Sequence, residues 1–189
     1  DRSNQPMNYE KYHIVFNGEI YNFAELRQEL EKGGSIFRTD HSDTEVLLAA
    51  YAEWGDAMVD RLNGMWSFVI YDRARRRLFG SRDRFGKKPF YYHHAHSSGL
   101  FAFASELTAL HGHPNVPRSI CAAAVRKFFA YGYVPAPLAM TDRTRKLPGG
   151  YSLSYELTSG DLKIWRYWEY QPEPVGNLSL DSSTEELRS

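Results

Sequence analysis

Apolar residues alternate through the chain at the spacing expected of β-strands. In 65–72, large apolar residues occupy every second position from Trp66 onward, and the positions between them are also mostly apolar. This pattern is typical of a strand that is buried on both faces. Further strands are expected at 12–16, 78–81, 90–95, 100–104, 151–157 and 162–170. Short polar turns join several of these strands, so the sequence predicts hairpins and antiparallel pairing.

Apolar residues at helical spacing lie between the strands. Two capping-box patterns, Asn22 with Glu25 and Ser42 with Glu45, predict the first turns of two helices, which glycines at 33–34 and 55 end. Further helices are expected at 56–62, at 106–110 with Ser105 as the cap, and at 119–130. About seven strands and four helices besides the short one at 56–62, with hairpins dominating, indicate an α+β fold.

A polar turn is expected directly after the strand at 12–16. Gly18 has no Cβ, so its backbone N–H can come close to a substrate, and the side-chain amide of Asn17 offers two further donors. Two donors that converge on one oxygen form an oxyanion hole, and the carboxylate of Glu19 beside them suits an ammonium group. Taken alone, an Asn-Gly pair is more often an ordinary turn.

Asp43 is expected as the first residue of the second helix. An acidic residue in a first turn is stabilised by the helix dipole by roughly 0.3–1 kcal/mol. The position of Asp43 therefore indicates a structural role when spacing alone is considered.

Composition and charge exclude several classes of function. The chain has 23 basic and 23 acidic residues, so its net charge is zero and binding to nucleic acid or to an acidic membrane is not expected. The arginine-rich segment 73–77 is interpreted as a solvated hairpin tip. No apolar run approaches the roughly 18 residues that a membrane span needs, and no signal peptide is recognised.

The titratable residues that could bind metal or act as nucleophiles are few. His93, His94 and His96 lack an Asp, Glu or Cys at ligand spacing, so no metal site is expected. Cys121 is the single cysteine, which excludes a disulfide framework and favours a reducing, cytoplasmic location. It is expected in the middle of the helix at 119–130 beside three alanines, where a small buried residue is typical.

Six motifs follow one another in a fixed order. They are NGEIYN at 17–22, SDTEV at 42–46, RDRFGKKPFYY at 82–92, FASEL at 103–107, YGYVPAP at 131–137 and KLPGG at 146–150. Together they resemble the glutamine amidotransferase domain of asparagine synthetases, in the class with an N-terminal cysteine nucleophile. The resemblance covers about 5–170. It departs at Gly149, where that family more often has a proline.

The resemblance implies a four-layer α/β/β/α sandwich of two mostly antiparallel sheets, the N-terminal-nucleophile hydrolase-like fold. Residues 1–170 would form the glutamine amidotransferase domain without its N-terminal part, and 171–189 a linker and the start of a synthetase domain. The chain begins with Asp1 and its first residues read as internal sequence, so we expect a fragment or a processed product. If a first strand is missing, the sheet edge left behind is a predicted association site.

The resemblance also assigns roles to four residues. Asn17 and the Gly18 N–H would form the oxyanion hole, and Glu19 and Asp43 would bind the α-ammonium group of L-glutamine. The chain has neither the family's cysteine nucleophile nor the arginine that pairs with the glutamine carboxylate. Cys121 is not expected to replace the nucleophile, so these residues alone should release no ammonia from glutamine.

The implied activity of the parent protein is that of an asparagine synthetase, which passes ammonia from glutamine to an ATP-activated aspartate. No cofactor is expected in this domain, whereas ATP and Mg²⁺ are expected in the synthetase domain. The synthetase domain would be a partner on the same chain, and a homodimer is a further candidate assembly. Two alternatives stay open. One is a scaffold domain without glutaminase activity, as in the β-lactam synthetases. The other is another amidotransferase of this class, making glucosamine phosphate or phosphoribosylamine.

Overall fold

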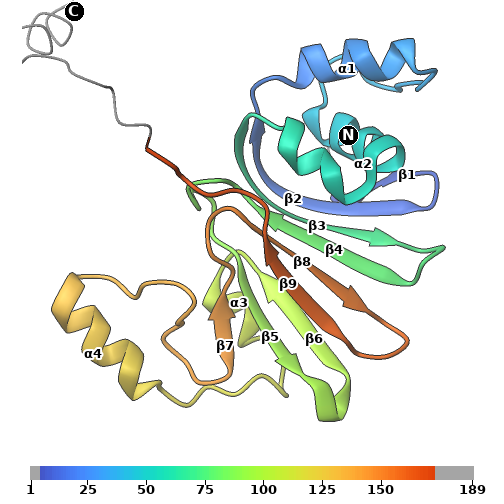
Figure 1. Ribbon diagram of the computed structural model, residues 1–189. Helices are drawn as coiled ribbons and strands as arrows, with labels where there is room; N and C mark the ends of the chain where they lie inside the picture. The colour runs from blue at the N-terminus through green and yellow to red at the C-terminus, as the bar shows by residue number, and fades with distance from the viewer. Residues whose placement is uncertain (1–4, 173–189) are drawn as a thin grey trace, which may run out of the picture.

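The computed structural model describes residues 5–172 of the 189-residue chain. Helices cover one face of a large sheet, and a smaller sheet lies against its other face (Figure 1). The expected helix start at 178–189 and most of the expected linker lie outside the described residues. No helix in the part of the chain that the structure describes is long and apolar enough to cross a membrane.

The large sheet has six strands, and every neighbouring pair is antiparallel. In spatial order they are β1 (Met7–Tyr9), β2 (Tyr12–Ile20), β3 (Gly64–Asp72), β4 (Arg77–Arg82), β8 (Tyr151–Glu156) and β9 (Leu162–Arg166). β2 pairs with β3 along its whole length, from Tyr12 opposite Asp72 to Ile20 opposite Gly64. β2 is longer than expected, since 17–20 continue the strand rather than forming a turn.

The small sheet has three antiparallel strands, with β5 (Tyr91–Ala95) between β6 (Leu100–Ala104) and β7 (Thr144–Lys146). The short 3₁₀ helix η2 (His96–Ser98) joins β5 to β6. The short helix α3 (Leu107–Leu110) contacts β5 and β6, so helices contact both sheets. Helix α4 (Ala122–Tyr131) projects from the rest of the molecule (Figure 1).

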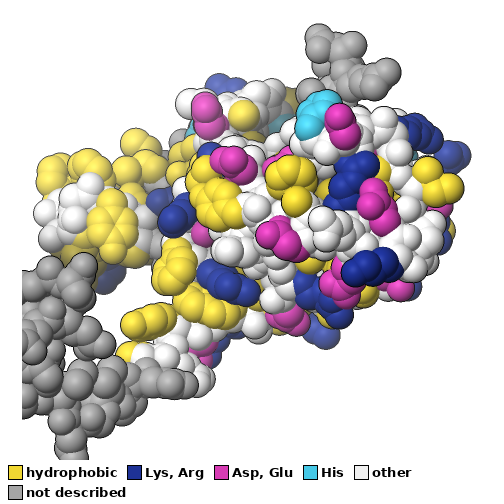
Figure 2. Space-filling view, turned by 90° about the horizontal axis from the view of Figure 1, so that it is seen from above, with side chains coloured by type: hydrophobic (Ala, Val, Ile, Leu, Met, Phe, Trp, Pro, Cys, Tyr) yellow, Lys and Arg dark blue, Asp and Glu magenta, His cyan; other side chains and the backbone are white. Residues whose placement is uncertain are grey.

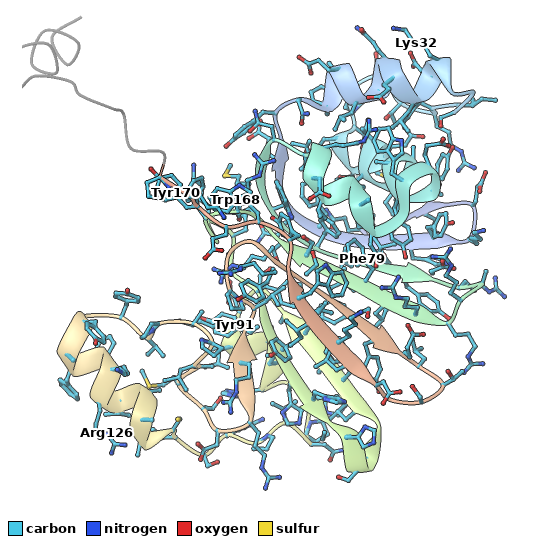
Figure 3. The ribbon with its side chains drawn as sticks, in the orientation of Figure 1. Lys32, Phe79, Tyr91, Arg126, Trp168 and Tyr170 are labelled. Carbon is cyan, nitrogen blue, oxygen red and sulfur yellow. The ribbon has the colours of Figure 1, made fainter. Side chains whose placement is uncertain are left out.

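Two cores hold these layers together. The first lies between the large sheet and three helical segments, α1 (Phe23–Lys32), α2 (Asp43–Trp54) and the 3₁₀ helix η1 (Gly55–Arg61). Phe79 of β4 lies in this core (Figure 3). The second core lies between the sheets and includes Val69, Phe90 and Leu153. Since Phe68 is buried in the first core and Val69 in the second, the prediction that this strand is buried on both faces is confirmed.

One of the two predicted capping boxes is wrong, and the other forms only in part, because the Glu45 carboxylate accepts from the Arg38 and Thr39 N–H groups rather than from Ser42. The hydroxyl of Ser42 accepts a hydrogen bond from the Glu45 N–H at 3.2 Å, as expected of a cap. Asn22 does not cap α1 with its side chain. Its amide instead donates to the Arg61 carbonyl at 3.0 Å and accepts from the Asn63 N–H at 2.9 Å. Asn22 therefore ties the start of α1 to the segment that leads into β3.

Cys121 lies in a different position from the one expected, and three histidines lie close to backbone carbonyls. Cys121 is the N-cap residue of α4 rather than a mid-helix residue, and it is partly exposed. His93 is buried and its Nδ1 lies 2.8 Å from the Arg143 carbonyl. His94 and His96 both place a ring nitrogen near the Gly160 carbonyl, at 3.0 and 3.3 Å.

The segment 83–89 is held by hydrogen bonds to two charged side chains, those of Arg82 and Asp83. Buried Asp83 accepts hydrogen bonds from the N–H groups of Phe85, Lys87 and Lys88 at 2.9–3.1 Å. The Arg82 guanidinium donates to three carbonyls of the same region at 2.6–2.7 Å. Burial holds the pKa of Arg82 below its usual value.

Gly149, the departure from the resembled family, has a packing reason in this chain. A Cβ at this position would lie 2.7 Å from the Gly86 nitrogen and 2.9 Å from the Arg84 carbonyl oxygen. The backbone of 84–86 therefore packs directly against Gly149. A proline here would need this loop to move, because every other residue carries a Cβ.

Candidate active site

The backbone of β3 determines which way the Gly18 N–H points. Trp66 of β3 lies opposite Gly18, and both of its backbone groups point away from β2. Its carbonyl accepts from the Asp83 N–H, and its N–H donates to the Asp83 carboxylate. In an antiparallel sheet, both backbone groups of a residue point to the same neighbouring strand. Gly18 and Trp66 are therefore a non-hydrogen-bonded pair, and the Gly18 N–H points away from β3.

The N–H groups on either side of Gly18 confirm this direction and bind side chains. The Phe16 N–H donates to Gln5 Oε1 at 2.7 Å, and the Ile20 N–H donates to Asp43 Oδ2 at 3.2 Å. The Gly18 N–H lies between them on the same edge of β2. Within residues 5–172 the structure provides it with no acceptor. It is therefore available to a substrate oxygen.

The reason for glycine at position 18 differs from the one expected. A Cβ there would lie 2.2 Å from the Met65 carbonyl oxygen and 2.8 Å from the Trp66 Cα. Real Cβ atoms do not approach this closely, so the residue is required by the contact between β2 and β3. The absence of a side chain does not itself open a path to substrate, because a side chain would point toward β3 and the helices.

Asn17 lies on the opposite face of β2, toward the small sheet. Its Nδ2 donates a hydrogen bond to Ser105 Oγ at 3.2 Å, directly after β6. This bond orients the amide and uses one of its two N–H groups, which leaves the other for a ligand. Ser105 was expected to cap α3, which is wrong, because α3 has no side-chain cap.

A cavity of about 330 Å³ lies between the two sheets beside this amide. Its polar lining comes from Gln5, Asn17, Ser67 and Ser105, and the rest is mainly aromatic and aliphatic. Asn17 and Ser67 are paired across β2 and β3, and Asn17 is bonded to Ser105, so these three polar residues lie together. Asn17 is the one predicted site residue that lines this cavity.

Asp43 and Glu19 provide negative charge near the same end of β2. Asp43 is the first residue of α2, as expected, and its carboxylate also accepts from the Thr44 hydroxyl at 3.3 Å. Glu19 is exposed and lies on the same face of β2 as Asn17, by strand alternation. Neither carboxylate forms an ion pair within residues 5–172, so both are available to a cationic group.

Sequence reasoning did not identify Gln5 and Ser105 as site residues. Ser105 belongs to the motif FASEL and Gln5 to the segment before β1, but no local pattern indicates that either contacts β2. The other chemically active residues are elsewhere. Cys121 lines a separate groove at the start of α4, and no group of three His, Cys, Asp or Glu in the described chain could hold a metal ion.

Comparison with curated proteins gives relatives along the whole domain. The chain is 36% identical over 179 residues to asparagine synthetase [glutamine-hydrolyzing] 3 of Bacillus subtilis, which covers 94% of this chain and 28% of that protein. It is 37% identical over 190 residues to asparagine synthetase [glutamine-hydrolyzing] 1 of the same organism, and this match covers 100% of this chain and 29% of that protein. The chain thus spans less than a third of the length of these relatives.

Solved structures support the fold. The glutamine phosphoribosylpyrophosphate amidotransferase of B. subtilis superposes with a TM-score of 0.58 at 20% identity, over 88% of this chain and 32% of that one. A class-II glutamine aminotransferase domain protein from Silicibacter pomeroyi superposes with a TM-score of 0.53 at 17% identity, over 87% of this chain and 70% of that one. These similarities show the N-terminal-nucleophile hydrolase-like sandwich of two antiparallel sheets with helices.

The match to a protein family covers most of the chain. The sequence model of the glutamine amidotransferase domain family matches residues 1–168. This range contains both sheets and all four residues of the predicted site. The chain belongs to the glutamine amidotransferase domain family.

Proposed function

We propose that, in the parent protein, this domain binds L-glutamine at the edge of β2 and hydrolyses its side-chain amide. The observation that carries the proposal is the pair of hydrogen-bond donors in the C-terminal half of β2. The Gly18 N–H points to the open edge of the strand, and the Asn17 amide is oriented by Ser105. Two such donors stabilise the oxyanion that forms when a nucleophile adds to the amide carbon.

Asp43 and Glu19 are proposed to bind the α-ammonium group of glutamine. Asp43 Oδ2 accepts from the Ile20 N–H, two residues beyond Gly18, so its carboxylate lies on the same edge as the oxyanion donor. Glutamine has its ammonium group at one end and its amide at the other. Donors for the amide oxygen together with carboxylates for the ammonium group therefore match both ends of this substrate.

The nucleophile is proposed to be a cysteine at the N-terminus of the mature parent protein, as the family resemblance implies. Its thiolate would add to the amide carbon, the C–N bond would break to release ammonia, and water would then hydrolyse the thioester to glutamate. Cys121 lies at the start of α4 and does not line the cavity beside Asn17. The 189-residue polypeptide is therefore expected to release no ammonia through Cys121.

The parent protein is proposed to use this ammonia to convert aspartate to asparagine. The names of the B. subtilis relatives support this acceptor. ATP and Mg²⁺ are proposed to act in a synthetase domain beyond this chain, and no residue described here is assigned to them.

The proposal is tested with Asn17→Ala in the parent protein. Loss of one oxyanion donor is expected to lower kcat for glutamine hydrolysis by about 10²- to 10³-fold. Amide formation from added ammonia is expected to stay unchanged, because that route does not use the glutaminase site. Equal losses in both assays would contradict the assigned role, since they would indicate general damage.

A second experiment tests the nucleophile. The parent is treated with a glutamine-like diazoketone, which alkylates glutaminase nucleophiles, and the labelled peptide is mapped. Label on an N-terminal cysteine, blocked by glutamine, is the expected result. Absence of label would favour a domain that keeps the fold for scaffolding.

A further inference from the structure

Helix α4 belongs to an arm, residues 119–141, that is fixed at its base. The Cys121 N–H donates to the Met140 carbonyl at 2.9 Å, and the Asp142 N–H donates to the Ser119 carbonyl at 2.9 Å. The return segment is also held, because Lys146 Nζ of β7 donates to the Val134 carbonyl at 2.6 Å. The two ends of the arm are therefore bonded to each other at its base, and its return segment is bonded to β7 of the small sheet.

The helix itself has almost no packing against the described molecule. Ala124 is its one buried residue in the described structure. Phe129 is 82% exposed and Phe128 44% exposed, and they share one face with Val125 at i, i+3 and i+4 spacing. Isolated helices of about ten residues are marginal in water and depend on packing of an apolar face. Within residues 5–172, nothing covers this face.

Two tyrosines extend the apolar surface beyond the helix. Tyr131 and Tyr133 are 57% and 62% exposed. Figure 2 shows hydrophobic side chains gathered at the left of the molecule, where α4 lies. Contiguous apolar surfaces of this kind mark interaction sites in soluble domains.

The surroundings of the arm are basic. Residues 111–150 contain six Lys or Arg and a single acidic residue, Asp142, although the whole chain has a net charge of zero. A wide groove of about 740 Å³ at the base of α4 is lined in part by Arg143 and Arg145. A complementary surface would therefore be apolar at its centre and acidic around it.

The described chain ends in the left half of the molecule, above the arm, in the view of Figure 3. Tyr170, near the point where the described chain ends, and Arg126 of α4 both lie on the left in Figure 3. Tyr170 is exposed and its ring lies 6.4 Å from that of Trp168, which packs edge-on against exposed Phe85 at 5.0 Å. A second group of exposed aromatic rings thus lies where the polypeptide leads onward.

We propose that the α4 arm is the docking surface for the domain that follows this one in the parent protein. The proposal rests on the proposed function in one respect, that a synthetase domain follows on the same chain. The relatives are more than three times as long as the segment that matches this chain. Their remaining length is sufficient for a further domain that could cover the arm. The docked surface is expected to be apolar with an acidic rim.

The test places a photoreactive benzoylphenylalanine at position 129 of the full-length protein. An aromatic replacement at so exposed a position should leave the fold intact. After irradiation, the expected result is a crosslink from residue 129 to the following domain of the same polypeptide, without a doubling of mass. The matched control carries the same residue at position 36, where Ile36 is 80% exposed in the segment after α1, and should give no such crosslink.

Three outcomes would overturn the proposal. The first is a product of doubled mass, which would assign the arm to a second copy of the protein. The second is a crosslink confined to residues 5–172, and the third is the absence of any crosslink. None of these readouts depends on activity. A protein that crosslinks as expected yet releases no ammonia from glutamine would contradict the proposed function and leave the docking surface standing.

Discussion

Residues distant in sequence contact Asn17 and the outward-facing N–H groups on either side of Gly18. Ser105 orients the Asn17 amide from 88 positions away, and Asp43 binds the Ile20 N–H from 23 positions away. The Phe16 N–H, which points outward from the edge of β2 two residues before Gly18, donates to the Gln5 side chain. As a result, Gly18 presents the one outward N–H between Phe16 and Ile20 that is not already bound within the described chain.

Ser105 is expected to act on catalysis by positioning Asn17. A net hydrogen bond contributes about 0.5–1.5 kcal/mol, so Ser105→Ala in the parent protein should lower kcat for glutamine hydrolysis by up to about tenfold, with KM little changed. Ser105→Thr keeps the hydroxyl and should recover most of the rate. Steady-state kinetics of the two variants measures this. A rise in KM with unchanged kcat, or no recovery with threonine, would contradict a positioning role.

At the scale of elements, the segment 83–89 shows how one buried carboxylate can organise a loop. Asp83 is 1% exposed and binds N–H groups of its own loop as well as that of Trp66. The Tyr167 hydroxyl donates to the Arg82 carbonyl at 2.8 Å, and the Gly150 N–H donates to the Asp83 carbonyl at 2.9 Å. The loop therefore connects β3, β4 and the segment after β9.

Removal of this carboxylate should destabilise the domain. A hydrogen bond to a charged group contributes about 1.5–3 kcal/mol, and Asp83 accepts from the N–H groups of Trp66, Phe85, Lys87 and Lys88, so Asp83→Ala should cost at least about 3 kcal/mol. For a domain of this size, that corresponds to a fall in Tm of roughly 6 °C or more, measured by thermal denaturation. The matched control is Asp161→Ala, since Asp161 is exposed and its side chain is not part of such a loop. A similar small change in both variants would show that the loop does not depend on Asp83.

At the scale of the whole molecule, Tyr51 lies where the helical layer meets the large sheet. Its ring packs edge-on against Tyr12 at 5.2 Å and parallel to Phe79 at 5.5 Å. The hydroxyl is buried and has no hydrogen-bond partner in the described structure. Burial raises the pKa of Tyr51 to about 12 from its ordinary value of 10.0.

This shift predicts a loss of stability in alkaline solution. The folded state favours the neutral phenol, so the unfolded state releases its proton first, and stability falls as the pH rises from about 10 to about 12. The loss is at most about 1.4 kcal/mol per pH unit in this window. Tyr51→Phe removes the ionising group and should show a smaller fall in the urea midpoint between pH 9 and pH 11 than the unsubstituted protein. Equal falls in the two proteins would contradict the assignment to Tyr51.

The local sequence pattern was sufficient to predict most helices and strands. It was insufficient for polar side chains that can bond either to a nearby helix start or to a residue distant in sequence. Ser42 caps α2 as predicted, because a helix start supplies its N–H groups within three residues. Asn22 and Ser105 have the same capping chemistry, yet they bind Arg61, Asn63 and Asn17, which only the folded chain brings near. Cys121 was misplaced for a similar reason, since the contact of its backbone with Met140 sets where α4 begins.

The sequence by itself determined the family, the alternation of strands and helices and the identity of the candidate residues at 17–19 and 43. Those features depend on residue type and on spacing along the chain, which the sequence contains in full. The tertiary structure decided which way the Gly18 N–H points, why that position must be glycine, and which residue orients Asn17. Each of these depends on the pairing of β2 with β3 or on the approach of β6, and pairing between distant strands is a property of the folded chain.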